Sequence, residues 1–211
     1  LIILSIITIS LLILLCLLYY FNLLPHKKYT NEFFGIKTYV SLIDKDNDGV
    51  DDQTDILMNA RNYIKTHPKY KSKYYRSGYP DDSYGVCTDV VAFAFLDAGY
   101  DLRELVNEHI NAYRNLYDID VVDKNIDFRR VLNLKIYFDY NAISLTTDIH
   151  KIEEWQGGDI VVFKKHIGIV SDKRNRHGIN FVIHHASPFQ KYYEEDILEH
   201  RNDIIGHYRI S

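Results

Sequence analysis

Residues 84–99 read YGVCTDVVAFAFLDAG and predict a buried helix that carries a cysteine in its first turn. The apolar residues recur at helical spacing, and Gly99 stands where a left-handed C-terminal cap is expected. A thiol at a helix N-terminus lies near unpaired backbone N–H groups and the positive end of the helix dipole, which favour the thiolate. Cys87 is therefore a candidate nucleophile, with a buried structural cysteine as the alternative.

Length and composition favour one folded domain. The chain has 211 residues, of which 46% are hydrophobic, and the first apolar segment leaves roughly 180 residues for a single core. Its 25 basic and 29 acidic residues are interspersed and give a net charge of −4, so the polybasic surface that nucleic-acid binding requires is not expected. No organic cofactor is expected either.

The N-terminal segment, residues 1–24, is predicted to be a membrane anchor or an uncleaved signal. Its length suffices to cross the hydrocarbon core as one helix, aromatic residues 19–21 suit the interface, and Lys27 and Lys28 mark the return to water. Cys87 is the single cysteine after this segment, which suits a secreted domain without a disulfide framework. We expect a single-pass protein of the cell membrane with its domain outside the cytoplasm.

An acidic loop at residues 44–55, DKDNDGVDDQTD, has the spacing of a calcium-binding loop. Oxygen ligands are expected at loop positions one, three, five, seven and twelve, with glycine at six for a sharp turn. The predicted ligands are Asp44, Asp46, Asp48, Val50 through its carbonyl, and Asp55. Asp55 is a shorter arm than the usual glutamate, and a single loop favours a structural clamp over a sensor. The alternative is a solvated acidic turn that caps the next helix.

The remaining pattern predicts an α+β fold. Further helices are expected at residues 53–67, 102–117 and 128–140, followed by strands at 160–163, 166–170 and 181–185 and a possible fourth at 204–210. Short links between strands predict an antiparallel meander, and helices followed by a sheet are typical of α+β domains. Residues 25–68 are assigned to a connector with the acidic loop and a helix, and residues 69–211 to the main domain.

A nucleophilic cysteine needs a base, and His166 at the start of a predicted strand is the candidate. Either His184 or His185 is expected to orient the ring of His166. Only one of the two can face it, because successive strand residues point to opposite faces of the sheet. Zinc bound by these three histidines and His207 is an alternative, although no paired-cysteine or H-E-x-x-H spacing supports it.

Arg129 and Arg130 stand near the start of the predicted helix at 128–140. Their guanidinium groups suit either a substrate carboxylate or an internal ion pair with Asp127, and the internal pair is the simpler expectation.

The chain resembles the NlpC-type bacterial cell-wall cysteine peptidases, a rearranged papain-like group. The matching motifs are residues 85–89, 158–163, 166–170 and 183–187. More closely, it resembles the bacterial family called domain of unknown function 1287. That likeness rests on residues 85–90, 125–130, 155–161, 166–172 and 206–209.

This resemblance implies a papain-like fold in which Cys87 is the nucleophile, His166 the base and His184 the orienting residue, with His185 as alternate. Val86 and Thr88 replace the aspartate and serine that usually flank the cysteine, so contacts with substrate near the thiol are expected to differ.

The expected function is that of an extracytoplasmic cysteine hydrolase that cleaves amide bonds in peptidoglycan or other peptides, with structural Ca²⁺. Acyl transfer or transpeptidation on the same scaffold is one alternative. The other is a non-catalytic cell-wall binding module that uses the calcium loop and a tyrosine-rich groove.

Overall fold

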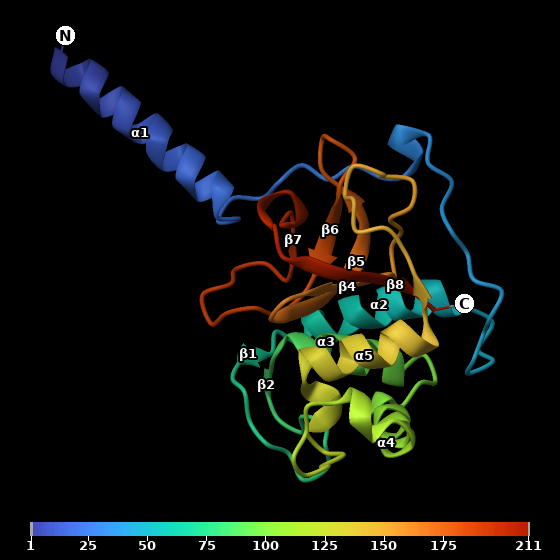
Figure 1. Cartoon of the computed structure of the whole chain (residues 1–211). Coiled ribbons are helices and arrows are strands. Elements are labelled where there is room, and N and C mark those ends of the chain that lie inside the picture. Colours follow the sequence, from blue (N-terminus) through green and yellow to red (C-terminus); the bar gives the residue numbers. More distant parts are fainter. Residues whose placement is uncertain (1, 211) are drawn as a thin grey trace.

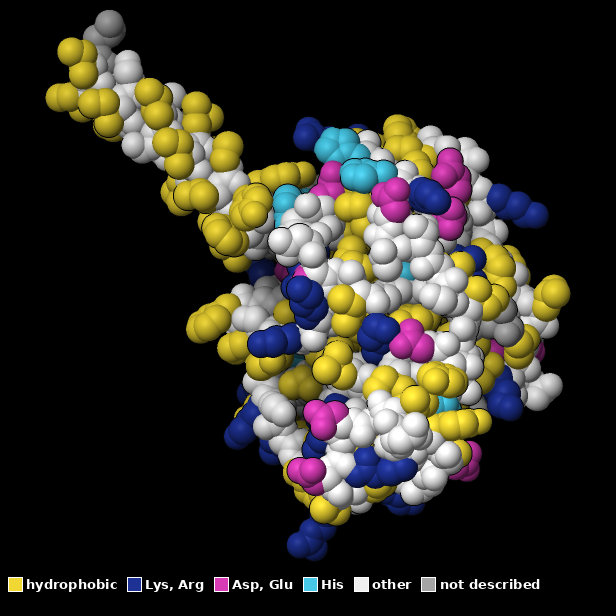
Figure 2. Space-filling model, in the orientation of Figure 1, with side chains coloured by type: hydrophobic (Ala, Val, Ile, Leu, Met, Phe, Trp, Pro, Cys, Tyr) yellow, Lys and Arg dark blue, Asp and Glu magenta, His cyan; other side chains and the backbone are white. Residues whose placement is uncertain are grey.

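Helix α1 (Ile2–Tyr20) extends away from the rest of the chain in the computed structural model, which describes residues 2–210 (Figure 1). None of its residues is buried, and Figure 2 shows hydrophobic side chains along its whole length. Within residues 2–210 it is the one helix that is long and apolar enough to cross a membrane. These properties are compatible with either a membrane anchor or a signal sequence.

The other helices form at the four predicted places. Their bounds are α2 (Asp52–Lys65), α3 (Cys87–Leu96), α4 (Leu102–Ala112) and α5 (Val131–Asn141). The helix predicted at 102–117 ends at residue 112 and continues as a short 3₁₀ turn, and the one predicted at 128–140 is preceded by another. These 3₁₀ turns are η1 (Glu32–Phe34), η2 (Arg114–Leu116), η3 (Asp127–Arg129) and η4 (Leu198–His200).

A six-stranded antiparallel sheet has the order β3-β8-β4-β5-β6-β7. Its strands are β3 (Ile143–Ser144), β4 (Ile160–Phe163), β5 (His166–Arg174), β6 (Asn180–Ile183), β7 (Glu194–Glu195) and β8 (Ile204–Arg209). Strands β4 to β7 are the predicted meander, extended by one strand. Strand β8 instead returns to the opposite side and pairs with β4. A separate parallel pair joins β1 (Lys69–Tyr70) to β2 (Tyr84–Gly85).

Both faces of the central strands are covered, which explains their continuous apolar runs. Ile160 and Val162 of β4 belong to the larger core between the sheet and the helices. Val161 and Phe163 point the other way into a second cluster around Trp155. In Figure 1 helices α2, α3 and α5 lie beside the sheet, with α4 farther from it.

Helix α2 lies in the segment predicted to be a connector, yet Ile56, Leu57 and Ala60 contribute to the same core as α3. Gly168 of β5 permits the close approach of β6, because a Cβ at this position would lie 2.6 Å from Cγ1 of Val182. The beginning of β5 and the end of β6 are therefore held close together, at the place where the candidate histidines lie.

Candidate active site

Cys87 is the first residue of α3, and it faces the start of β5. It is a free cysteine, partly exposed as a residue, although its sulfur is buried. The backbone N–H groups of Ile167, the residue after His166, and of Thr88 lower the pKa of the sulfur and favour its thiolate. The sulfur thus lies against the strand residue next to the predicted base, although the two are far apart in sequence.

The acidity of Cys87 differs from the expectation drawn from its helix position. Burial of the sulfur is the largest effect and raises the pKa of Cys87 to about 11, with a further contribution from the negative charge of Asp89. The N–H groups at the start of α3 and at Ile167 act in the opposite direction but do not outweigh the burial. The thiol is therefore the favoured form in this structure, and the expectation of a resting thiolate is wrong.

The two histidines of the predicted site are in direct contact. Nε2 of His166 lies 2.9 Å from Nδ1 of His184, and the two rings meet edge to face. His185 faces the other way, between the rings of Tyr70 and Tyr193. Of the two neighbouring histidines, His184 is therefore the one that faces His166.

Glu195 on β7 extends this contact to a third group that sequence reasoning missed. One carboxylate oxygen lies 3.2 Å from Nε2 of His184. The amide of Gln190 also donates to Glu195 and to the carbonyl of His184, which holds the loop before β7 against the end of β6. The result is a continuous polar chain in which His166, His184 and Glu195 follow one another.

Burial keeps this polar chain close to neutral. It lowers the pKa of both His166 and His184 to about 3, and the positive charge of Arg201 acts in the same direction. Burial also raises the pKa of Glu195 to about 7, against the hydrogen bonds from Gln190 and from the backbone N–H of Tyr192. Among His166, His184 and Glu195, the Glu195 carboxyl is thus the group that changes its charge near neutral pH.

The ionisation of Glu195 determines which nitrogen of His166 is basic, since each neutral imidazole carries one proton. An ionised Glu195 accepts the Nε2 proton of His184, whose Nδ1 then accepts the Nε2 proton of His166. Nδ1 of His166 is left with a free lone pair. Within residues 2–210 no hydrogen bond joins the Cys87 sulfur to the His166 ring, a contact that often tightens only when substrate binds.

A buried ion pair fixes the start of α3 behind the cysteine. The guanidinium of Arg129 donates to both carboxylate oxygens of Asp89, at 2.6 and 2.9 Å, and Asp89 accepts from the backbone N–H of Val86 at 2.8 Å. Arg129 thus forms an internal pair, but with Asp89 and not with Asp127. The exposed Arg130 is the one that faces Asp127, at 3.7 Å.

The four histidines considered for zinc do not form a cluster. His207 is fully buried, with Nε2 2.9 Å from Asp159, Nδ1 2.7 Å from the carbonyl of Thr146, and its ring stacked on Trp155. In the described part of the chain, three or more possible metal ligands converge only at Asp44, Asp46 and Asp48.

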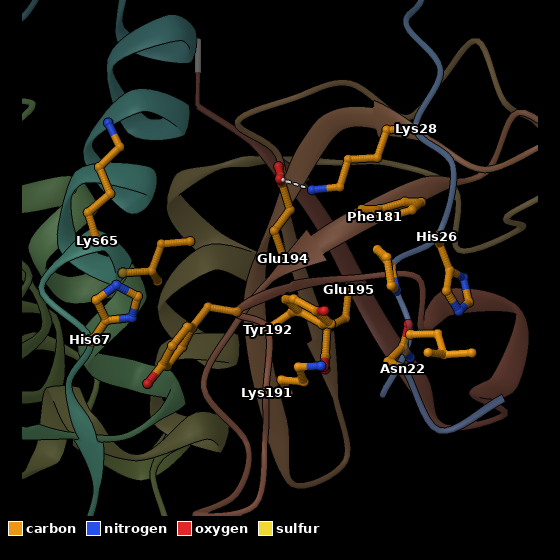
Figure 3. A pocket seen from close by; sticks show the side chains of 14 residues that line it. Asn22, His26, Lys28, Lys65, His67, Phe181, Lys191, Tyr192, Glu194 and Glu195 are labelled. Carbon is orange, nitrogen blue, oxygen red and sulfur yellow. Dashed lines mark hydrogen bonds and ion pairs between the residues drawn. The ribbon is translucent and has the colours of Figure 1, made fainter. Parts of the chain in front are cut away.

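A cavity of about 320 Å³ adjoins the polar chain through Glu195. It lies between the end of α2, the segment after α1, and β7. Figure 3 shows Lys65 and His67 on one side and Lys28 and His26 on the other. Glu195 is part of its wall, but Cys87 and His166 are not. The cavity and the cysteine are thus separate features, and Glu195 is the member of the polar chain that lines the cavity.

The fold and this site define an α+β domain in which a helix that begins with a cysteine packs against the strand that begins with one histidine of a contacting pair. The chain belongs to the family described as Domain of unknown function (DUF1287), whose sequence profile matches residues 57–210. The matched region contains Cys87, both contacting histidines and Glu195.

One relative is the uncharacterized protein YijF of Escherichia coli (strain K12). It is 34% identical over 151 residues, which cover 67% of this chain and 72% of that protein. No solved structure matches the chain.

Proposed function

We propose that this protein is a papain-like, NlpC-type cysteine hydrolase that cleaves amide bonds in the peptides of peptidoglycan. The 2.9 Å contact between His166 and His184 carries the proposal, since it joins a candidate base to an orienting group beside a helix-terminal cysteine. The resemblance of the motifs around Cys87 and His166 to cell-wall cysteine peptidases supports the choice of substrate.

The reaction begins from a neutral thiol and a neutral imidazole, because burial opposes both charges. As the Cys87 sulfur bonds to the amide carbonyl carbon, the thiol proton passes to Nδ1 of His166. The carbonyl oxygen becomes an oxyanion, and N–H groups at the start of α3, including that of Cys87, stabilise it. Each well-placed donor contributes roughly 3 kcal/mol.

The second half of the reaction returns the protons. The His166 imidazolium donates its proton to the amine, which leaves as the C–N bond breaks, and a thioester with Cys87 remains. His166 then accepts a proton from water as the water oxygen attacks the thioester. The C–S bond breaks as the acid product forms, and the leaving sulfur takes that proton back from His166. His184 orients the ring of His166 through both steps.

Helix α1 supports a location at the cell membrane, with the domain outside the cytoplasm where peptidoglycan lies. Its side chains are exposed over its whole length, which suits lipid better than water. Protease treatment of intact and of opened cells tests this orientation. Digestion of the domain only after the cells are opened would contradict it.

The two cysteines offer a matched test of the activity. Full-length protein in detergent is incubated with purified muropeptides, and the products are separated by mass. Cys87→Ala is expected to abolish hydrolysis, whereas Cys16→Ala, which alters the exposed cysteine of α1, is expected to retain it. Hydrolysis by Cys87→Ala at the wild-type rate would refute the proposal. An added amine that appears in the product would show acyl transfer instead.

The separate cavity favours a second candidate function, a membrane-anchored module that binds cell-wall peptides without turnover. Its lining contains lysines and tyrosines but neither Cys87 nor His166. Binding of muropeptides that is equal in the wild type and in Cys87→Ala, with no product from either, would favour this candidate.

A further inference from the structure

The loop at residues 44–55 brings three carboxylates together. One oxygen each from Asp44, Asp46 and Asp48 lies within 4.8 Å of the others. The backbone N–H of Gly49 donates to Asp44 at 3.0 Å, and Gly49 itself has a φ of +94° at the sharp turn. The loop backbone thus holds like charges close to one another, at an electrostatic cost.

A fourth carboxylate adds an independent observation. Asp55 is only 8% exposed, and its Oδ2 is buried and has no hydrogen-bond partner among the described residues. Asp55 stands at the twelfth position of the loop, in the first turn of α2, soon after the three converging carboxylates. A buried carboxylate oxygen without a donor, in the same loop as three converging carboxylates, would gain a partner if a cation bound there.

We propose that this loop is a Ca²⁺ site, with ligands from the side chains of Asp44, Asp46, Asp48 and Asp55 and from the carbonyl of Val50. Five oxygen donors from one loop suit Ca²⁺ better than Mg²⁺, which requires a smaller octahedral site. Because Asp55 is shorter than glutamate, the affinity falls in the range of extracellular modules, with a Kd of about 10⁻⁴–10⁻³ M. The site is independent of the proposed cysteine chemistry and lies before the region that the family matches.

The position of the loop indicates what the ion would hold. Asp55 belongs to the first turn of α2, and Asp52 accepts hydrogen bonds from the backbone N–H of Lys45 and from the hydroxyl of Tyr100. The loop also packs against the end of α3, where a Cβ on Gly99 would lie 3.4 Å from the backbone nitrogen of Asp46. The ion therefore fastens the start of α2 to the far end of the cysteine helix.

Calcium titration of the full-length protein in detergent, stripped of metal with EDTA, tests the site. Calorimetry is expected to show one Ca²⁺ per chain, and about 5 mM Ca²⁺ is expected to raise the melting temperature well above the effect of equal Mg²⁺. Asp46→Asn is expected to weaken Ca²⁺ binding at least about tenfold, because it removes a charged ligand. Asp118→Asn, which removes an exposed aspartate outside the loop, is the matched control and leaves binding unchanged.

The metal-free proteins separate loss of the site from loss of the fold. Without Ca²⁺, Asp46→Asn is expected to melt no lower than the wild type, since it relieves repulsion in the loop. Absence of binding heat and of any melting shift at about 5 mM Ca²⁺ would overturn the proposal. So would a calcium response that Asp46→Asn and Asp118→Asn retain equally, which is the behaviour of a solvated acidic turn.

Discussion

The two ends of helix α3 carry opposite kinds of polar structure. At its start, the charged and imidazole groups of the candidate site have partners: Asp89 is paired with Arg129, and His184 lies between His166 and Glu195. At its far end, the acidic loop gathers carboxylates, and one buried oxygen of Asp55 lacks a partner.

This difference separates two chemical roles on one helix. Imidazole and carboxyl groups that contact one another in sequence can orient a ring and move a proton. Carboxylates that converge with only backbone N–H groups as donors can instead hold a cation. The comparison supports the proposed proton transfer at the start of α3 and the proposed ion binding near its end, and the predictions below test the first of these.

The largest expected effect is the pH dependence of alkylation at Cys87. In the Cys16→Ala background, the rate with iodoacetamide is expected to rise about tenfold per pH unit, or about 10³-fold from pH 6 to pH 9, because the pKa of about 11 keeps the sulfur protonated. Mass spectrometry of the labelled peptide measures the rate. A plateau below pH 8 would reveal a stable thiolate and contradict this account.

Breaking the buried pair is expected to cost about 3–5 kcal/mol of unfolding free energy, because Asp89→Asn leaves the Arg129 charge without its partner. Urea denaturation followed by the fluorescence of Trp155 measures the loss. Arg130→Ala is the matched control, because Arg130 is half exposed, and it is expected to cost less than about 1 kcal/mol. Equal losses for both variants would show that the Asp89 pair does not fix the start of α3.

The neighbouring histidines are expected to differ in their effect on hydrolysis. His184→Ala removes the group that orients His166 and is expected to lower kcat about 10–100-fold, as removal of an orienting partner typically does. His185→Ala, whose ring lies between Tyr70 and Tyr193, is expected to stay within about threefold of wild type. Equal losses would place both histidines in a structural role.

A smaller effect is expected from Glu195→Gln. Since the pKa of Glu195 is raised to about 7, wild-type hydrolysis is expected to rise severalfold as the pH passes through about 7, where the ionised carboxylate leaves Nδ1 of His166 basic. The variant is expected to lose this rise while it keeps its fold. If Glu195→Gln showed the same pH dependence of hydrolysis as the wild type, Glu195 would not control the basicity of His166.

The raised pKa of Glu195 also determines the direction in which the free energy of unfolding changes with pH. The folded state favours the protonated Glu195, so its stabilising contribution is complete below the usual glutamate pKa of 4.5 and is lost as the pH rises towards 7. As the pH rises towards 7, ionisation of Glu195 is therefore expected to lower the stability of the protein and to raise its hydrolytic activity.

Local patterns predicted the helices and the central strands, because helical spacing and alternation report burial directly. The partners of the candidate site could not be predicted in this way. Glu195 comes from a two-residue strand that pairs with β6 after an irregular loop, and Arg129 pairs with Asp89, which lies 40 positions away, although Asp127 is nearer in sequence. The acidity of Cys87 depends on how deeply the sulfur is buried, which only the packing of α3 against β5 reveals.

The position of strand β8 was equally beyond local reasoning. Its sequence predicts a strand, but its pairing with β4 is a choice between distant edges of the sheet. The acidic loop differs, because its residues follow one another along the chain, and the spacing alone predicted that the carboxylates of Asp44, Asp46 and Asp48 converge.

The segment after α1 limits how far the domain can stand from a membrane. Lys28 bonds to Glu194 at 2.6 Å and His26 lies 3.2 Å from Asp196, so the chain is fastened on both sides of Glu195 soon after the helix ends. From Tyr20 to Lys28 a fully extended chain reaches at most about 28 Å. With α1 in a bilayer, this short tether would keep the domain at the lipid surface, where it meets only material that lies beside the membrane.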